Sequence, residues 1–140
     1  MKTFKQFIFE DQMKMSAFNL PRSQMPQIKD IDSFLSYVSS QGHSSMDMFG
    51  DVDDFRPTQT DYNQEKVDRI KHDMIRNPRI NTKSIIVTSD GFVLDGHHRY
   101  LAAKQLGEMI PYYELSTNVT DSLKLAYEYL NTSESVQNRF

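Results

Sequence analysis

The chain of 140 residues contains no cysteine. This absence excludes disulfide bonds, thiolate nucleophiles and zinc sites with sulfur ligands. The sequence also has no apolar run near the roughly 18 residues that a membrane span requires, and its start lacks the long apolar core of a secretory signal. We therefore expect no membrane partner and no secretion, but a location in the cytoplasm or inside a particle.

An excess of positive charge is missing as well. The formal net charge is −3 and the pI is near 5.8, whereas general nucleic-acid binders are usually strongly basic. Nucleic acid is therefore not a favoured partner, although a local basic patch stays open. The composition, 38% hydrophobic and 25% charged, is typical of a folded globular domain. The length fits one domain with one appended segment.

The first part of the chain, residues 1–49, is predicted to precede the main domain. Residues 1–15 form an amphipathic segment in which large apolar side chains recur at helical spacing. A linker or surface arm with two prolines follows over 16–30, and a short helix over 31–40. The polar stretch 41–50, rich in serine and methionine, is predicted to be a loop.

The second part, residues 50–131, is predicted to be an α+β domain in which helices pack on a mixed sheet of short strands. Its patterns predict an edge strand over 51–59, a helix over 63–76, strands over 84–88 and 92–94, a helix over 96–106, a strand over 109–115 and a helix over 120–130. The polar tail, residues 132–140, is expected to fray.

The most informative stretch is Val93–Tyr100, which reads VLDGHHRY. A strand ends there, Gly96 allows a tight turn, and a helix begins whose first N–H groups have no intrahelical partner. Such a helix start attracts anions. Arg99 adds a planar cationic fork that suits phosphate oxygens, and His97 and His98 add further donors. The stretch therefore predicts a phosphate site.

A structural interpretation of the same residues stays open, because Asp-Gly pairs are common in turns and paired histidines often make only structural hydrogen bonds. Asp95 as the N-cap of the helix is favoured over Asp95 as a base. A metal site formed by Asp95, His97 and His98 is not expected, because adjacent side chains on a helix diverge by about 100°.

Two longer stretches resemble the ParB/sulfiredoxin superfamily. VLDGHHRYLAAKQLG followed by MIPYYEL is similar to its second box, in which a Gly-x-His-Arg or Gly-Glu-Arg-Arg turn holds nucleotide phosphates. FRPTQTDYNQEKVDRIKHDMIRNP is similar to its first box, an Arg-Pro strand followed by a Lys-Val helix. The order and spacing of both boxes match, which is more specific than the short turn alone.

The resemblance implies binding of ATP or another nucleotide. Mg²⁺ is a further candidate cofactor. Lys66 would lie near the nucleotide, and Arg56 beside the reactive centre. The expected nucleotide-binding residues are Lys66, Gly96, His97, His98 and Arg99. The expected catalytic residues are Asp95, His97 and Arg56.

Several departures from the family limit what is carried over. His97 stands where sulfiredoxins have the reactive cysteine, so reduction of sulfinic acid is excluded. Arg69 and Asp73 replace two hydroxyl-bearing residues of the nucleotide helix. No helix-turn-helix reader follows, so chromosome partition is not expected. The sequence DGHHR is more similar to the corresponding motif of the superfamily's free-serine kinases and of small phage proteins called ParB-like nucleases.

The start of the chain, MKTFKQFIFE, is similar to the capsid-targeting leader of internal head proteins in T-even-like phages, which a protease cuts after a glutamate such as Glu10. This similarity implies packaging in a virion head. The alternative is an amphipathic segment that covers the domain's own sheet.

Three functions follow. The first is nucleotide-dependent phosphoryl transfer or hydrolysis, in which Asp95, Asp54 or Glu65 orients a nucleophile or holds Mg²⁺. The second is a packaged phage protein that binds and inhibits a host factor without catalysis. The third is a ParB-like nuclease, which the acidic net charge disfavours.

Overall fold

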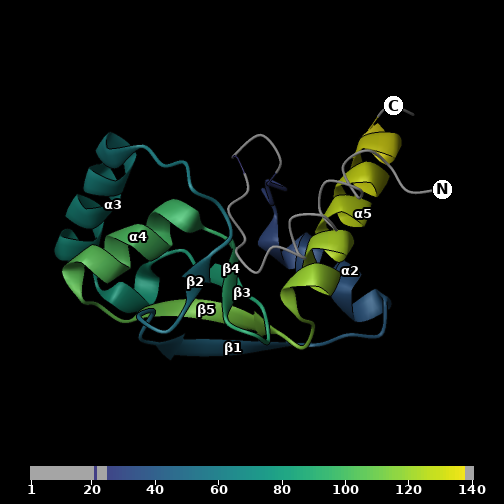
Figure 1. Ribbon diagram of the computed structural model, residues 1–140, viewed down its shortest axis with the longest axis horizontal. Coiled ribbons are helices and arrows are strands. Elements are labelled where there is room, and N and C mark those ends of the chain that lie inside the picture. Colours follow the sequence, from purple (N-terminus) through teal and green to yellow (C-terminus); the bar gives the residue numbers. More distant parts are fainter. Residues whose placement is uncertain (1–20, 22–24, 138–140) are drawn as a thin grey trace.

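Two layers of helices enclose one mixed β-sheet in the computed structural model, which describes residue 21 and residues 25–137 (Figure 1). The predicted α+β class is confirmed. The helices are α2 (Ile31–Ser40), α3 (Gln64–Arg76), the 3₁₀ turn η2 (Arg79–Asn81), α4 (His97–Leu106) and α5 (Val119–Gln137). The strands are β1 (Ser45–Gly50), β2 (Arg56–Pro57), β3 (Ile85–Val87), β4 (Phe92–Asp95) and β5 (Ile110–Leu115).

The sheet has the strand order β1-β5-β3-β4-β2. Antiparallel pairs join β1 with β5 and β3 with β4, whereas β3 with β5 and β4 with β2 run parallel. The predicted hairpin turn joins β3 to β4, and its Gly91 has φ +87°. The sheet therefore ends at β1 on one edge and at the two-residue strand β2 on the other.

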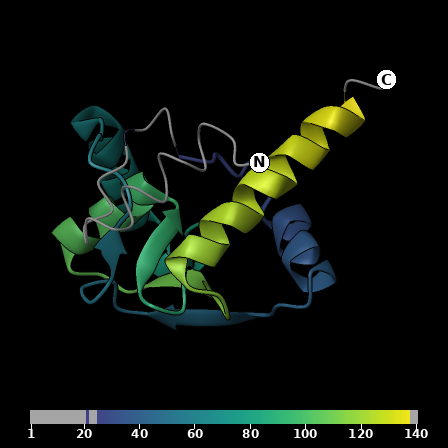
Figure 2. The same ribbon diagram turned by 45° about the vertical axis from the view of Figure 1, so that its right-hand side comes forward.

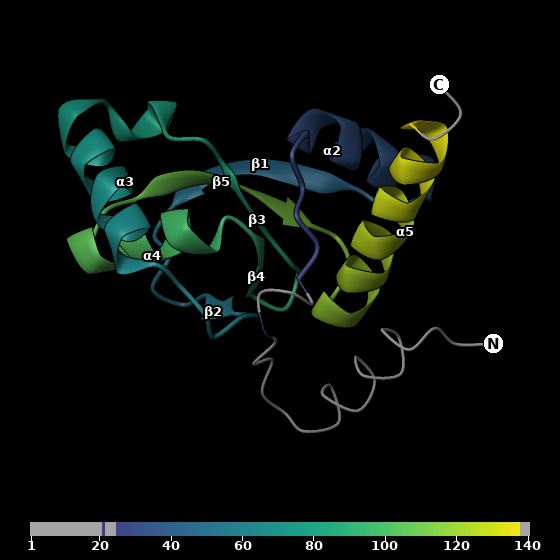
Figure 3. The same ribbon diagram turned by 90° about the horizontal axis from the view of Figure 1, so that it is seen from above.

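Each face of the sheet carries its own core. Helices α3 and α4 cover one face and α2 and α5 the other, as the view from above shows (Figure 3). All three residues of β3 are fully buried: Ile85 and Val87 belong to the core under α3 and α4, and Ile86 to the core under α2 and α5. Burial on both faces explains the continuous apolar run of this strand.

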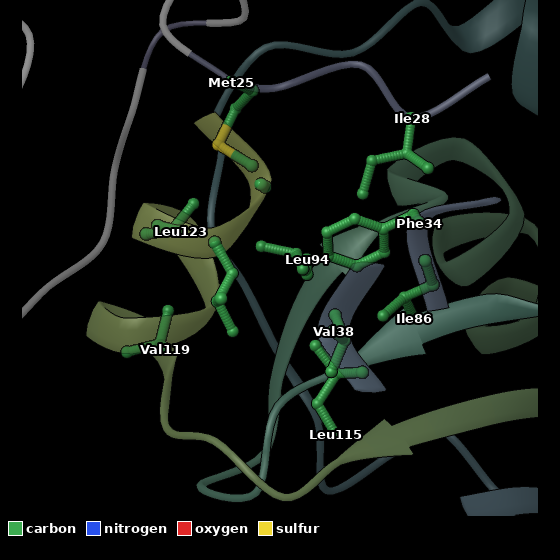
Figure 4. Close-up of a cluster of buried hydrophobic side chains, with 11 residues drawn as sticks. Met25, Ile28, Phe34, Val38, Ile86, Leu94, Leu115, Val119 and Leu123 are labelled. Carbon is green, nitrogen blue, oxygen red and sulfur yellow. The ribbon is translucent and has the colours of Figure 1, made fainter. Parts of the chain in front are cut away.

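Two side chains of the segment before α2 lie in the core under α2 and α5. Met25 is 6% exposed and Ile28 is 5% exposed, and Figure 4 shows both among the cluster that includes Phe34 and Leu94. The sequence predicted only a linker or surface arm here. Residues 25–28, called the N-terminal arm below, are therefore part of the packed structure.

Replacing Ile28 with valine is expected to lower the free energy of unfolding by about 1 kcal/mol, because a buried methylene is lost. Ile75→Val is the matched control, since Ile75 is 62% exposed and its replacement is expected to change stability by less than about 0.5 kcal/mol. Urea denaturation measures both. Equal effects of the two substitutions would contradict packing of the arm.

Several predicted elements agree with the structure. Helix α2 has the predicted bounds, α3 begins one residue after its predicted start, with Asn63 as N-cap, and α4 ends before Gly107. The predicted edge strand over 51–59 is confirmed only for Arg56–Pro57.

Two other secondary-structure predictions were wrong. Residues Ser45–Gly50, predicted as loop, form β1, because all six pair with β5 from far along the chain. Helix α5 continues to Gln137 through part of the tail that was expected to fray, and Figure 2 shows it projecting away from the sheet. Two predictions lie outside the described residues, the amphipathic segment 1–15 and the capsid-targeting leader at the start of the chain. Residues 138–140 lie outside them as well. No described helix combines the length and apolar character needed to cross a bilayer.

Candidate functional site

The turn between β4 and α4 forms the centre of the site. Asp95 is the last residue of β4 and pairs with Ile86. Gly96 follows with φ 90° and ψ 35°, and α4 begins at His97. The N-cap is therefore Gly96, which has no capping side chain, and the prediction that Asp95 caps the helix was wrong. The strand extends one residue further than expected, which places the Asp95 carboxylate beside the turn.

Glycine is required at position 96 for two reasons. A positive φ of this size strains residues that carry a Cβ. A Cβ here would also lie 2.6 Å from Ile85 Cγ2 and 2.8 Å from Arg99 Nη2. The backbone of the turn is thus packed directly against the first residue of β3 and the guanidinium.

A hydrogen bond ties the start of α3 to the start of α4. The Asn63 N–H donates to Nε2 of the buried His98 ring at 3.1 Å. The Asn63 side chain in turn caps α3 by accepting from the Lys66 N–H at 3.2 Å. Because Nε2 accepts, the neutral His98 ring carries its proton on Nδ1. This link brings the first turn of α3, and with it Lys66, to the DGHHR turn.

Arg99 is held inside the protein by one of its terminal nitrogens. Its Nη2 donates to the Ser84 carbonyl at 3.2 Å and lies 3.5 Å from Asp95 Oδ2. Its Nε is buried without a hydrogen-bond partner among the described residues. The Asp95 carboxylate thus takes up one of the terminal nitrogens of the guanidinium. A phosphate at this site would have to share Arg99 with Asp95.

Burial dominates the electrostatics of this pair. It raises the pKa of Asp95 above its ordinary value, against the opposing effects of Arg99, a hydrogen bond from the Ile28 backbone and Lys83. It also lowers the pKa of Arg99, which Asp95 partly offsets. The carboxylate is therefore a stronger base than an exposed aspartate, and its negative charge is only partly compensated.

A cavity of about 140 Å³ lies in front of the turn. It brings together side chains from the N-terminal arm, the segment after β2, α3, the segment before β3 and the DGHHR turn. The lining residues are Met25, Pro26, Gln27, Ile28, Gln59, Lys66, Ile70, Lys83, Leu94, Asp95, Gly96, His97, His98 and Arg99. The predicted site residues Lys66, Asp95, Gly96, His97, His98 and Arg99 therefore meet in one cavity.

Arg56 does not line this cavity. It pairs with Phe92 at the opposite end of β4 from Asp95 and is exposed. Phe92 and Asp95 are three residue steps apart along the strand, which corresponds to about 10 Å. Asp54 and Glu65, the other candidate carboxylates, also lie outside the lining. Asp95 is thus the carboxylate that the described cavity contains.

Several lining residues were missed by the sequence interpretation, and two of them, Gln59 and Lys83, bear on ligand binding. Gln59 is 9% exposed, and its Oε1 is buried without a hydrogen-bond partner among the described residues. The neighbouring Thr58 hydroxyl donates to the Val93 carbonyl at 2.7 Å, which fixes this segment beside β4. Lys83, from the segment before β3, is the second. An uncompensated buried amide at a cationic cavity indicates a place for a polar ligand.

The histidines lie together without forming a metal cluster. The rings of His97 and His98 are 5.7 Å apart at 73°. Among the described residues, no group of three or more histidine, cysteine, aspartate and glutamate side chains is arranged to hold a metal ion.

No protein-family model, curated protein or solved structure matches this chain. What the site binds must therefore follow from its own residues and geometry.

Sulfate binding is expected to strengthen as the pH falls through the pKa of Asp95, which burial raises above the ordinary value of an aspartate. Sulfate stays dianionic there, whereas protonation of Asp95 removes a repelling charge and releases Arg99. Asp95→Asn is expected to bind sulfate about tenfold more tightly at neutral pH, roughly 1.4 kcal/mol.

Calorimetry across the pH range measures both effects. His97 and His98 also line the cavity and remain in the Asp95→Asn variant, so a pH dependence that comes from Asp95 must be weaker in the variant. An unchanged dependence would assign the effect to the histidines.

Proposed function

We propose that this cavity binds the phosphate end of ATP or another nucleotide, for phosphoryl transfer or hydrolysis, in a protein of the ParB/sulfiredoxin type. One observation carries the proposal. Lys66, Lys83 and Arg99 come from three separate segments and line one small cavity at a helix start that no side chain caps. Such convergence of positive charge with open helix amides suits a polyanion.

The two boxes support the family assignment by meeting in space. Lys66 belongs to the first box and the DGHHR turn to the second, and both line the same cavity although about thirty residues separate them in the chain. The element order strand, helix, strand, strand, helix, strand from β2 to β5 also accommodates both boxes.

The size of the cavity limits which part of a nucleotide it accepts. Ligand pockets usually measure roughly 300–1,000 Å³, so about 140 Å³ fits a phosphate group rather than a nucleoside. A neighbouring cavity of about 460 Å³ shares Ile70, Lys83 and Arg99 with it. In this proposal the phosphate end lies in the small cavity and the rest of the nucleotide extends into the larger one.

Asp95 is the proposed catalytic group. In phosphoryl transfer an oxygen of water or of a small hydroxyl substrate bonds to the terminal phosphorus, while the bond to the leaving phosphate breaks. The Asp95 carboxylate would accept the proton of that hydroxyl, which its raised pKa favours. Arg99 and Lys66 would neutralise charge on the phosphates. Mg²⁺, when present, is proposed to enter bound to the phosphates.

Isothermal titration calorimetry with ATP, ADP, CTP and GTP, with and without Mg²⁺, tests the proposal. We expect saturable binding of at least one nucleotide, followed by release or transfer of phosphate in a colorimetric assay with free serine or water as acceptor. Absence of heat for every nucleotide at millimolar concentration would overturn the binding step. Binding without turnover would limit the protein to a nucleotide-dependent binding role.

A further inference from the structure

Lys83 lies at the junction of three cavities. It lines the cavity of about 140 Å³ at the DGHHR turn, the neighbouring 460 Å³ cavity and an open hollow of about 440 Å³ beside the start of α2. Among the described residues, no other lines all three. A ligand that extends out of the small cavity into either neighbour would therefore lie beside Lys83.

The backbone beside Lys83 is fixed at the site. Its neighbour Ser84 accepts a hydrogen bond from Arg99 Nη2 at 3.2 Å. The next residue, Ile85, begins the fully buried strand β3 and packs against the turn at Gly96. The exposed Lys83 side chain thus extends from a rigid point next to Arg99, and its charge acts on Asp95.

The two cations differ in how they can meet a phosphate. Arg99 is 21% exposed in its side chain and is bound to Ser84 and Asp95. It can therefore contact only a phosphate that enters the cavity. Lys83 is exposed and carries a compact charge on a flexible stem. Lys83 is therefore suited to bind a phosphate that stays at the entrance of the cavity.

We propose that Lys83 is a specificity-determining residue that binds the second phosphate of the ligand, so that the site selects diphosphate ends over a single phosphate. This inference rests on the proposed function, because it assumes that the first phosphate lies in the cavity at Gly96 and Arg99. It assigns the substrate class as compounds that end in a phosphoanhydride, such as nucleoside di- and triphosphates or pyrophosphate.

The test compares inorganic phosphate with pyrophosphate in calorimetry at one ionic strength, with wild type, Lys83→Ala and Lys71→Ala. Wild type is expected to prefer pyrophosphate at least tenfold. Lys83→Ala is expected to bind pyrophosphate about tenfold more weakly, in line with the loss of a charge-assisted hydrogen bond, and phosphate less than about threefold more weakly. Lys83→Arg is expected to retain the preference.

Lys71→Ala is the matched control and is expected to bind like wild type. Lys71 lies on α3, donates to Gln105 at 3.1 Å and lines none of the three cavities. If Lys83→Ala weakens both anions equally, or neither, the inference is overturned while the proposed function stands. If wild type binds neither anion nor any nucleotide, the proposed function fails, and the inference with it.

Discussion

Arg99→Ala is expected to weaken binding of nucleotide or pyrophosphate about 100-fold, or roughly 2.7 kcal/mol, within the range for hydrogen bonds to charged groups. The substitution removes the guanidinium that lines the cavity and whose Nε is buried without a hydrogen-bond partner among the described residues. Arg99→Lys keeps the charge but loses the planar fork, so an intermediate loss is expected. Calorimetry measures the affinities.

The control for this substitution is Arg76→Ala. Arg76 is exposed in the last turn of α3 and lines none of the cavities described above, so its loss tests for a general effect of charge. Arg99 also bonds to Ser84 and Asp95, so thermal melting must establish that the Arg99→Ala variant is folded at the temperature of the titration. A folded variant with wild-type affinity would remove Arg99 from the site.

Gly96→Ala is expected to have the largest effect on stability. The positive φ costs an alanine about 1–2 kcal/mol, and the contacts of its Cβ with Ile85 at 2.6 Å and Arg99 at 2.8 Å add about 1–3 kcal/mol of overpacking. Because Ile85 is fully buried at the start of β3, it has little room to move. The expected total loss in the free energy of unfolding is about 2–5 kcal/mol.

Gly42→Ala separates these two costs. Gly42 has φ +86°, close to the φ of Gly96, but nothing lies within 4 Å of a Cβ built there. Only the backbone strain of about 1–2 kcal/mol is expected. Chemical denaturation of both variants gives the steric part as their difference. Equal losses would mean that the turn at Gly96 relaxes freely, and the close packing of Ile85 on it would be refuted.

Local signals predicted most of the elements correctly. Val67 and Met74 follow the helical period of α3 and are buried, and Gly107, with φ +67°, ends α4 as expected. The apolar run of β3 and the Ser-Asp-Gly turn after it likewise gave the hairpin. In these cases the interactions that determine the element lie within a few residues of one another in the sequence. The local pattern of apolar and turn residues therefore predicts the element.

The failures have distant causes. Strand β1 is defined by its pairing with β5, whose residues follow some sixty positions later, and such pairing overrides local propensity. Lys83 belongs to neither box, and Gln59 was given no role although it lies in the first box. Only the folding of their two separate segments brings both residues to the turn. Asp95 was predicted to cap α4 but is the last residue of β4, one residue beyond the predicted end of the strand. The ends of elements are the part of a sequence pattern that is least well determined.

The walls of the cavity in front of the DGHHR turn come from several segments between Met25 and Arg99 in the chain. In the unfolded chain these segments are independent, so an anion has no comparable site there. A ligand that binds only the folded state therefore raises the free energy of unfolding of the whole domain. At one hundred times its dissociation constant, such a ligand adds about 2.7 kcal/mol. Under the proposed function, the cellular supply of the proposed ligand would thus help to determine how long each folded molecule survives unfolding and proteolysis.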